Sequence, residues 1–96
     1  MTGSTRSSEG LDERRRRLLF RAWRRGTREL DLIMGRFLDD AIVTMTDAEV
    51  EEFERLCTLP DLELYAWIVG SKPVPAEYDT PLFRRIRDFD HAAASH

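Results

Sequence analysis

The sequence has little of what enzymes and metalloproteins commonly use. It contains one cysteine, Cys57, and two histidines, His91 and His96, which lie near the end of the chain. A single thiol cannot close an intrachain disulfide or supply a thiolate zinc site. Because no histidine lies in the body of the chain, neither a His-paired nucleophile nor a histidine metal site is expected there. These absences predict a protein without a catalytic or metal site of its own, in a reducing compartment.

Long apolar segments are also missing. No run approaches the ~20 residues that a membrane-spanning helix needs, and the longest extends only from Leu64 to Val69. Residues 1–13 combine three acidic residues with no apolar segment, which fits neither a secretory signal nor an acid-poor transit peptide. With 96 residues, 42% apolar and 34% charged, we expect one small globular domain in the bacterial cytoplasm.

Alternating β-strand patterns are absent, and helical spacing of apolar residues extends over most of the chain. We therefore expect an all-α protein, a small five-helix bundle over residues 11–90. Residues 1–10 are rich in Ser, Thr and Gly and are expected to form a disordered tail. Residues 91–96 are expected to form a short polar tail.

Start and stop signals divide the bundle. The first helix is expected from Leu11 to near Arg25 and the second from Leu30 to Met45. The third is expected to follow a capping box at Thr46 to Glu49. The fourth is expected from Pro60 to Gly70, and the fifth is expected to begin at Thr80 and Pro81 and to continue through Phe89. The fourth is apolar nearly all round and is expected to be the most buried, with Tyr65 and Trp67 in the core. Gly35 interrupts the second helix at a cost of about 1 kcal/mol relative to alanine, which close packing against another helix would explain. For Trp23 the pattern does not decide between core and surface.

The net charge of −3 conceals an uneven distribution. Residues 1–36 hold ten arginines against five acidic residues, residues 37–83 hold two basic residues against eleven acidic ones, and residues 84–96 hold three arginines against two acidic ones. A bipolar surface can orient a protein partner more readily than it binds a uniform polyanion. The acidic stretch from Asp47 to Glu54 lacks the alternating oxygen ligands of a calcium loop and is interpreted as a solvated face.

The arginine run at Arg14–Arg17 allows a second interpretation, a small helical arginine-rich regulator that binds nucleic acid. Clustered cations are what phosphate binding requires. Against this interpretation, the overall charge is negative and the stacking aromatics of RNA-binding modules are missing. A solvated helix face is the commoner explanation for such a run, and we expect no nucleic-acid partner.

The stretch from Arg24 to Asp31, called the corner below, separates the first two helical patterns. Gly26 can adopt a positive φ or end a helix, so the chain can turn sharply there while Arg25, Arg28 and Glu29 point outward. If Gly26 is the N-cap of the second helix, Glu29 occupies the third helical position, where a carboxylate meets free amide donors. By spacing alone, a simple helix stop with solvated charges is the commoner interpretation, because glycine ends many helices.

The corner also carries a resemblance to a known family. Arg25, Gly26 and Glu29 form an Arg-Gly-x-x-Glu pattern that continues through Asp31 to Phe37, and it resembles the signature of the SdhE-type succinate dehydrogenase flavinylation and assembly factors. A second match follows about thirty residues later, at Pro60-Asp61, Leu64-Tyr65, Trp67-Ile68 and Gly70. Together the resemblance covers roughly residues 14–89.

This resemblance implies a helper protein rather than an enzyme. It would bind the flavoprotein subunit of succinate dehydrogenase, or of the related fumarate reductase, and promote covalent attachment of FAD to a histidine of that subunit. The same resemblance implies that Arg25, Gly26 and Glu29 engage the subunit, with Arg28 and Asp31 as neighbours. No FAD is expected to be stably bound here, because the chain lacks a Gly-rich strand-to-helix turn; FAD would belong to the partner.

Overall fold

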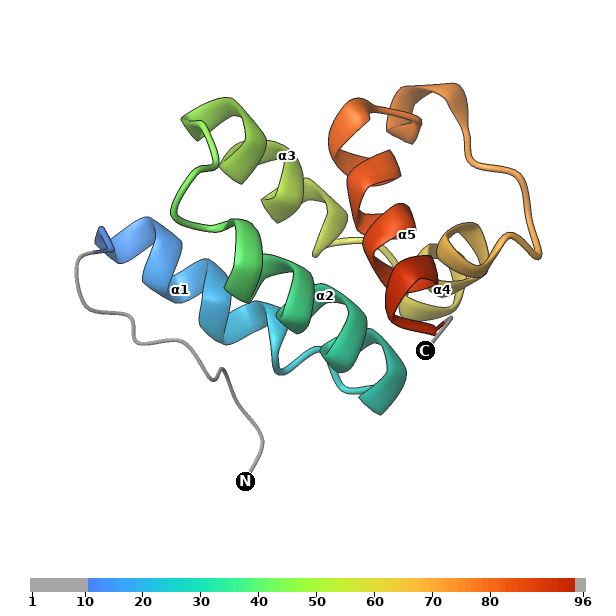
Figure 1. The fold of residues 1–96 in the computed structure, drawn as a ribbon, viewed down its shortest axis with the longest axis horizontal. Helices are drawn as coiled ribbons and strands as arrows, with labels where there is room; N and C mark the ends of the chain where they lie inside the picture. The colour runs from blue at the N-terminus through green and yellow to red at the C-terminus, as the bar shows by residue number, and fades with distance from the viewer. Residues whose placement is uncertain (1–10, 95–96) are drawn as a thin grey trace.

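The helices predicted from the apolar spacing are present in the structure. A computed structural model describes residues 11–94, in which five α-helices and one 3-10 turn occur without any strand (Figure 1). The elements are α1 (Glu13–Ala22), α2 (Arg28–Ala41), α3 (Asp47–Leu56), α4 (Asp61–Val69), the 3-10 turn η1 (Ala76–Tyr78) and α5 (Pro81–Ala94). The all-α fold is therefore confirmed. The tail expected at residues 1–10 lies outside the described residues.

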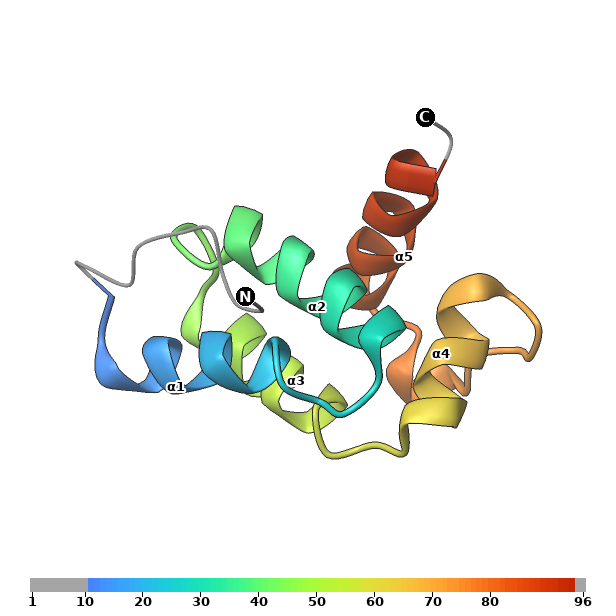
Figure 2. The ribbon, with the colours of Figure 1, turned by 90° about the horizontal axis from the view of Figure 1, so that it is seen from below.

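The core is organised around α2. This helix packs against α1 and α5, and α5 also contacts α3 and α4 (Figures 1 and 2). The ring of Phe37 on α2 lies 6.3 Å from that of Phe53 on α3 and 5.8 Å, edge-on, from that of Phe89 on α5. Met34 and Leu38, on the same stripe, are fully buried. The stripe predicted for the second helix is thus the one that three other helices cover.

Several predicted helix ends are confirmed. Thr46 and Glu49 form a reciprocal capping box, in which the Glu49 amide donates to the Thr46 hydroxyl at 3.1 Å and the Thr46 amide donates to the Glu49 carboxylate at 3.0 Å. Gly70 follows α4 with a left-handed φ of 85°, the conformation that lets a helix end at glycine. The Phe83 amide donates to the Thr80 hydroxyl at 3.2 Å, so Thr80 caps α5.

Other expected bounds are wrong. α1 ends at Ala22 rather than near Arg25, because the Arg24 amide bonds to the Arg21 carbonyl in a tighter turn and the chain leaves the helix. α2 ends at Ala41 rather than Met45. α5 continues through Ala94, so residues 91–94 are helix and not tail. The His91 ring contacts the carbonyl of Ile68 at 3.1 Å, which anchors this last part of α5 to α4.

The expectation that α4 is the most buried helix is wrong, because one of its faces is exposed. Leu62 is 84% exposed, Val69 41% and Tyr65 37%, so Tyr65 is not a core residue, whereas Trp67 is buried as expected. The three exposed residues are spaced three and four apart and therefore lie along one face of the helix. Because α4 is apolar on nearly all sides beyond its first turn, its composition alone could not indicate which side the fold covers.

Close packing does explain the glycine inside α2. A Cβ placed on Gly35 would lie 2.5 Å from two ring carbons of Trp23, closer than real carbon contacts. Trp23 is buried against this backbone, and its indole nitrogen donates to Asp39 at 3.2 Å. The undecided position of Trp23 is thereby resolved: it is a core residue that joins the end of α1 to α2.

Gly35→Ala is therefore expected to destabilise the fold although alanine favours helix. Overpacking a core costs typically 1–3 kcal/mol, which we expect to exceed the gain of about 1 kcal/mol in helix propensity, because the rigid, hydrogen-bonded indole must move. Urea denaturation should show a lower free energy of unfolding. In a Trp23→Leu background the same change should be neutral or stabilising; equal destabilisation in both backgrounds would contradict the steric explanation.

Candidate functional site: an exposed corner between two hollows

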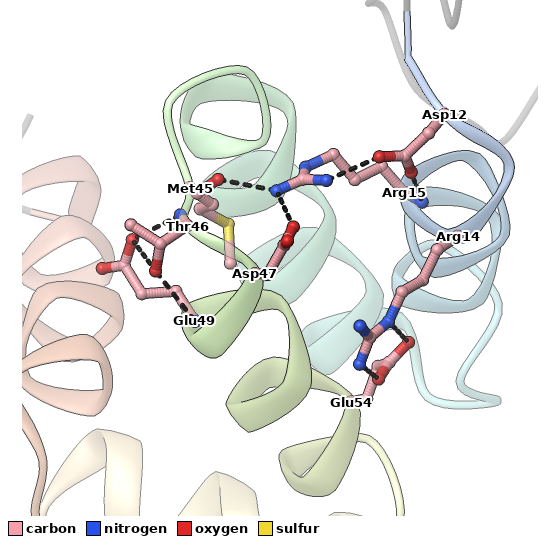
Figure 3. A network of polar contacts seen from close by, with 8 residues as sticks. All are labelled: Asp12, Arg14, Arg15, Met45, Thr46, Asp47, Glu49 and Glu54. Atoms are coloured by element: carbon pink, nitrogen blue, oxygen red, sulfur yellow. Dashed lines mark hydrogen bonds and ion pairs between the residues drawn. The ribbon is translucent and has the colours of Figure 1, made fainter.

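Some arginines on the basic face of α1 bind acceptors elsewhere in the molecule. Arg14 donates through two nitrogens to Glu54 of α3, at 2.6 and 3.0 Å, and Arg15 donates to Asp12, to Asp47 and to the carbonyl of Met45 (Figure 3). The hydrogen bonds from Arg14 hold the pKa of Glu54 below its ordinary value, and the backbone and side-chain bonds from Arg15 do the same to the pKa of Asp12. These contacts fix α1 against α3.

The same contacts correct the interpretation of residues 47–54 as a solvated face. Asp47 and Glu54 are bound to α1, Glu49 accepts from Arg85 of α5 at 2.9 Å, and Glu52 accepts a hydrogen bond from Thr80. The acidic face of α3 is thus an intramolecular partner for arginines on two neighbouring helices. Among the described residues, no group of three or more histidine, cysteine, aspartate or glutamate side chains is placed to hold a metal ion.

The corner turns at Gly26, where φ is +111°, a value that side chains with a Cβ rarely adopt. The N-cap of α2 is Thr27 rather than Gly26, so Glu29 occupies the second helical position and not the third. The backbone amide of Arg25 donates to the Asp31 carboxylate at 2.6 Å. Asp31 therefore closes the turn from inside the chain.

Arg25 does not point outward, as had been expected, but into the molecule. Its guanidinium, with the side chain only 5% exposed, donates to the carbonyls of Cys57 and Leu59 at 2.8 and 2.9 Å and to the Asp61 carboxylate at 2.7 Å. These acceptors lie just beyond α3 and at the start of α4, where backbone carbonyls lack helical partners. Arg25 thus binds the corner to the connection between α3 and α4.

Arg28 and Glu29 are the residues of the predicted site that face solvent. Both are exposed on the first turn of α2, with Gly26 exposed beside them. Within residues 11–94, neither side chain makes a hydrogen bond or an ion pair. The predicted site is therefore divided: Arg25 and Asp31 hold the turn, and Gly26, Arg28 and Glu29 remain available to a partner.

Two hollows flank the corner. One, of about 360 Å³, lies between the end of α1 and the connection from α3 to α4, and is lined by Phe20, Arg21, Arg24, Arg25, Cys57, Leu59, Pro60 and Asp61. The other, of about 390 Å³ and called the α2–α4 groove below, is lined by Glu29, Leu32, Ile33, Arg36, Tyr65, Val69 and Asp90. Figure 2 shows the first turn of α2 beside α4, where this groove lies. Glu29 belongs to both the corner and the groove.

The first hollow is lined by one thiol, that of Cys57, which is not activated as a nucleophile. Burial raises the pKa of the Cys57 thiol, which the nearby Arg25 only partly offsets, so the thiol remains protonated at neutral pH. Arg24 lies over the exposed ring of Phe20, 3.9 Å from its centroid. His91, the histidine within the described residues, is engaged with the Ile68 carbonyl and is not paired with Cys57. Neither group is arranged for covalent catalysis.

The sequence did not identify Val69 and Asp90 as groove residues, and it placed Tyr65 in the core rather than at a surface. The signal for those on α4 was present in the fourth helical segment, where Leu62, Tyr65 and Val69 recur along one face of the helix and Leu64 and Ile68 along another. A short helix with apolar residues on both sides can bury only one of them in a small bundle. The fold leaves its second apolar side exposed.

The class of protein that residues 11–94 define is a small all-α domain with an exposed charged corner. Residues 16–90 match the family described as the flavinator of succinate dehydrogenase. The chain belongs to this family, as the resemblance of its corner predicted. The match extends from α1 into α5 and includes the corner and the groove.

Individual relatives agree with this membership. The chain is 42% identical over 80 residues to the FAD assembly factor SdhE of Acetobacter pasteurianus, covering 83% of this chain and 73% of that protein. It is 36% identical over 73 residues to the mitochondrial succinate dehydrogenase assembly factor 2 of Mycosarcoma maydis, covering 76% of this chain and 31% of that protein. For the mitochondrial assembly factor 2-B of Drosophila ananassae the identity is 32% over 85 residues, covering 86% and 52%. The chain thus spans about three quarters of the bacterial relative and a third to a half of these mitochondrial ones.

Proposed function

We propose that this protein is a FAD assembly factor that binds the flavoprotein subunit of succinate dehydrogenase, or of fumarate reductase, and promotes covalent attachment of FAD to that subunit. The observation that carries the proposal is the family match over residues 16–90. The bacterial relative named as a FAD assembly factor supports it, and the bacterial cytoplasm is the compartment we propose. No described helix is long and apolar enough to cross a membrane.

The corner is the surface we assign to this partner. Arg28 and Glu29 present opposite charges on one exposed turn, next to Gly26, whose positive φ fixes the direction of the chain. Arginine offers a planar set of donors to carboxylates or carbonyls, and glutamate accepts from a basic side chain or an amide. Such a pair can be matched by a partner in one orientation only. Arg25 and Asp31 serve this surface indirectly, by holding the turn.

The proposed action needs no catalytic group on this chain. A protein that binds one conformation of its partner more tightly raises the population of that conformation. Each ~1.4 kcal/mol of differential affinity changes that population about tenfold. If the favoured conformation brings the flavin close to its acceptor histidine, bond formation is promoted while the chemistry remains that of FAD and the flavoprotein subunit. FAD is accordingly proposed to belong to the partner, without a stable complex with this chain.

Nucleic-acid binding by the arginine run is not supported. Two of its four arginines, Arg14 and Arg15, are already bound to carboxylates of α1 and α3, which lowers the positive charge available to phosphates. Arg17 is also paired, with Glu13 at 3.0 Å. The basic face of α1 is better explained as a structural contact.

The proposal is tested by covalent flavin itself. In cells of the source organism that lack this protein, flavin fluorescence of the denatured flavoprotein subunit should fall several-fold, and expression of this chain should restore it. The purified protein should carry no flavin absorbance. Unchanged covalent flavin in the deletion strain would refute the proposed function.

A further inference from the structure

One apolar face of α4 is left exposed by the described part of the fold. Leu62, Tyr65 and Val69 are spaced along one side of this helix and are 84%, 37% and 41% exposed. Helices on the surface of small domains usually place polar residues on their outer side. Here Tyr65 and Val69 instead continue into the α2–α4 groove, where the half-buried Leu32 and Ile33 extend the apolar lining. The lining thus combines apolar side chains from two helices.

The charges at the groove indicate the chemistry of its occupant. Glu29 and Asp90 contribute carboxylates from α2 and α5, and Arg36 contributes one guanidinium. Within residues 11–94, none of these three side chains makes a hydrogen bond or an ion pair. Most carboxylates of α3, by contrast, are bound to arginines or a hydroxyl of neighbouring helices. Two free carboxylates beside an apolar surface complement an apolar side chain accompanied by a basic one.

The position of the groove indicates which molecule supplies that segment. Glu29 lies on the corner and also lines the groove, so the two surfaces are continuous. A partner that contacts the exposed side of the corner is brought directly to the groove. A volume of about 390 Å³ accommodates a few side chains, which suits a short protein segment.

We infer that the α2–α4 groove binds a segment of the flavoprotein subunit in which an apolar side chain is accompanied by a lysine or an arginine. This inference rests on the proposed function, which names the partner, and adds the second surface through which it is held. The apolar side chain packs between Ile33 and Tyr65 with Val69, and the basic group meets Glu29 and Asp90. The corner then sets the orientation of the partner, and the groove adds apolar contact area.

The test compares two valine substitutions. Val69→Asp places a carboxylate in the groove, whereas Val43→Asp places one at another exposed valine, 59% exposed, after the far end of α2. Both variants should keep the helical circular dichroism and the melting temperature within a few degrees of wild type. Calorimetric titration with the flavoprotein subunit should show a Kd raised at least tenfold for Val69→Asp and less than twofold for Val43→Asp.

A charge variant tests the second half of the inference. Asp90→Asn should raise the Kd about threefold or more and weaken its dependence on salt, because one carboxylate facing the basic group is removed. An unchanged Kd and salt dependence would overturn the assignment of a basic side chain.

The outcomes separate this inference from the proposed function. If wild type does not bind the flavoprotein subunit at all, the proposed function fails and the inference fails with it. If wild type and Val69→Asp bind it equally well, the groove inference alone is overturned. If sedimentation shows that wild type self-associates and that Val69→Asp prevents this without changing the Kd for the flavoprotein subunit, a second copy of this chain occupies the groove and the inference is likewise overturned.

Discussion

Replacing Arg25 with alanine is expected to destabilise the protein by about 3–5 kcal/mol, the range for breaking a buried charge pair by removing one partner. The guanidinium bonds to two carbonyls and to Asp61 in a nearly dry setting, and its loss leaves all three acceptors without this donor. Small domains have a total stability of only about 5–15 kcal/mol. Urea denaturation followed by circular dichroism should therefore show a large drop in the midpoint.

Arg25→Lys is the control for this prediction. Lysine keeps the positive charge but offers a single ammonium in place of a planar set of donors, so it cannot reproduce the three contacts together. Its stability should lie between wild type and Arg25→Ala. A stable Arg25→Ala variant with a wild-type unfolding midpoint would show that this arginine does not hold the two connections together.

Glu29→Ala is expected to have the opposite profile, with a preserved fold and lost function. The side chain is exposed and has no hydrogen bond or ion pair within residues 11–94, so its removal should change stability by no more than about 0.5 kcal/mol. Removing one member of a charge pair at a protein interface costs about 2–5 kcal/mol of binding, roughly thirtyfold or more in Kd. Covalent flavin on the partner subunit should decrease accordingly, as measured by in-gel flavin fluorescence.

Glu51→Ala provides the matched control for Glu29→Ala. Glu51 is also an exposed glutamate in the first half of a helix, and it lines neither of the two hollows at the corner. This variant should support flavin attachment as wild type does. A specific role for the corner would be contradicted if both variants lost covalent flavin equally. It would also be contradicted if neither variant lost any.

These two predictions divide a short motif into two kinds of residue. Arg25 is a positioning residue that acts through the fold, and Glu29 is a contact residue that acts through the partner. Loss of flavin attachment in Arg25→Ala should follow the fraction of unfolded protein and should be relieved at lower temperature. Loss in Glu29→Ala should persist wherever the protein is folded.

The sequence predicted the elements better than the direction of the side chains. Apolar spacing and capping residues were sufficient for the five helices, since the stripe of α2 and the Thr46 capping box are local signals. The inward turn of Arg25 was not predictable in this way, because its acceptors lie more than thirty residues away in the chain. The exposed face of α4 was missed for a related reason: an apolar helix carries no polar side to mark the surface.

The fold nevertheless explains some features that the sequence only raised as questions. Gly35 is small because the Trp23 ring lies against it, and the acidic face of α3 is charged because arginines of α1 and α5 bind there. Both are long-range contacts. The corner could be predicted from the sequence because its glycine, arginine and glutamate residues are close together in the chain. The family resemblance then indicated that this pattern binds a partner.

The most direct measurement of the central claim is an NMR cross-saturation experiment on the isotopically labelled protein bound to the unlabelled flavoprotein subunit. The account predicts loss of signal intensity at the amides of Gly26, Arg28 and Glu29 and at those of the groove residues of α2 and α4. Loss of intensity confined to Arg14–Arg17 on α1, with the corner unaffected, would contradict it.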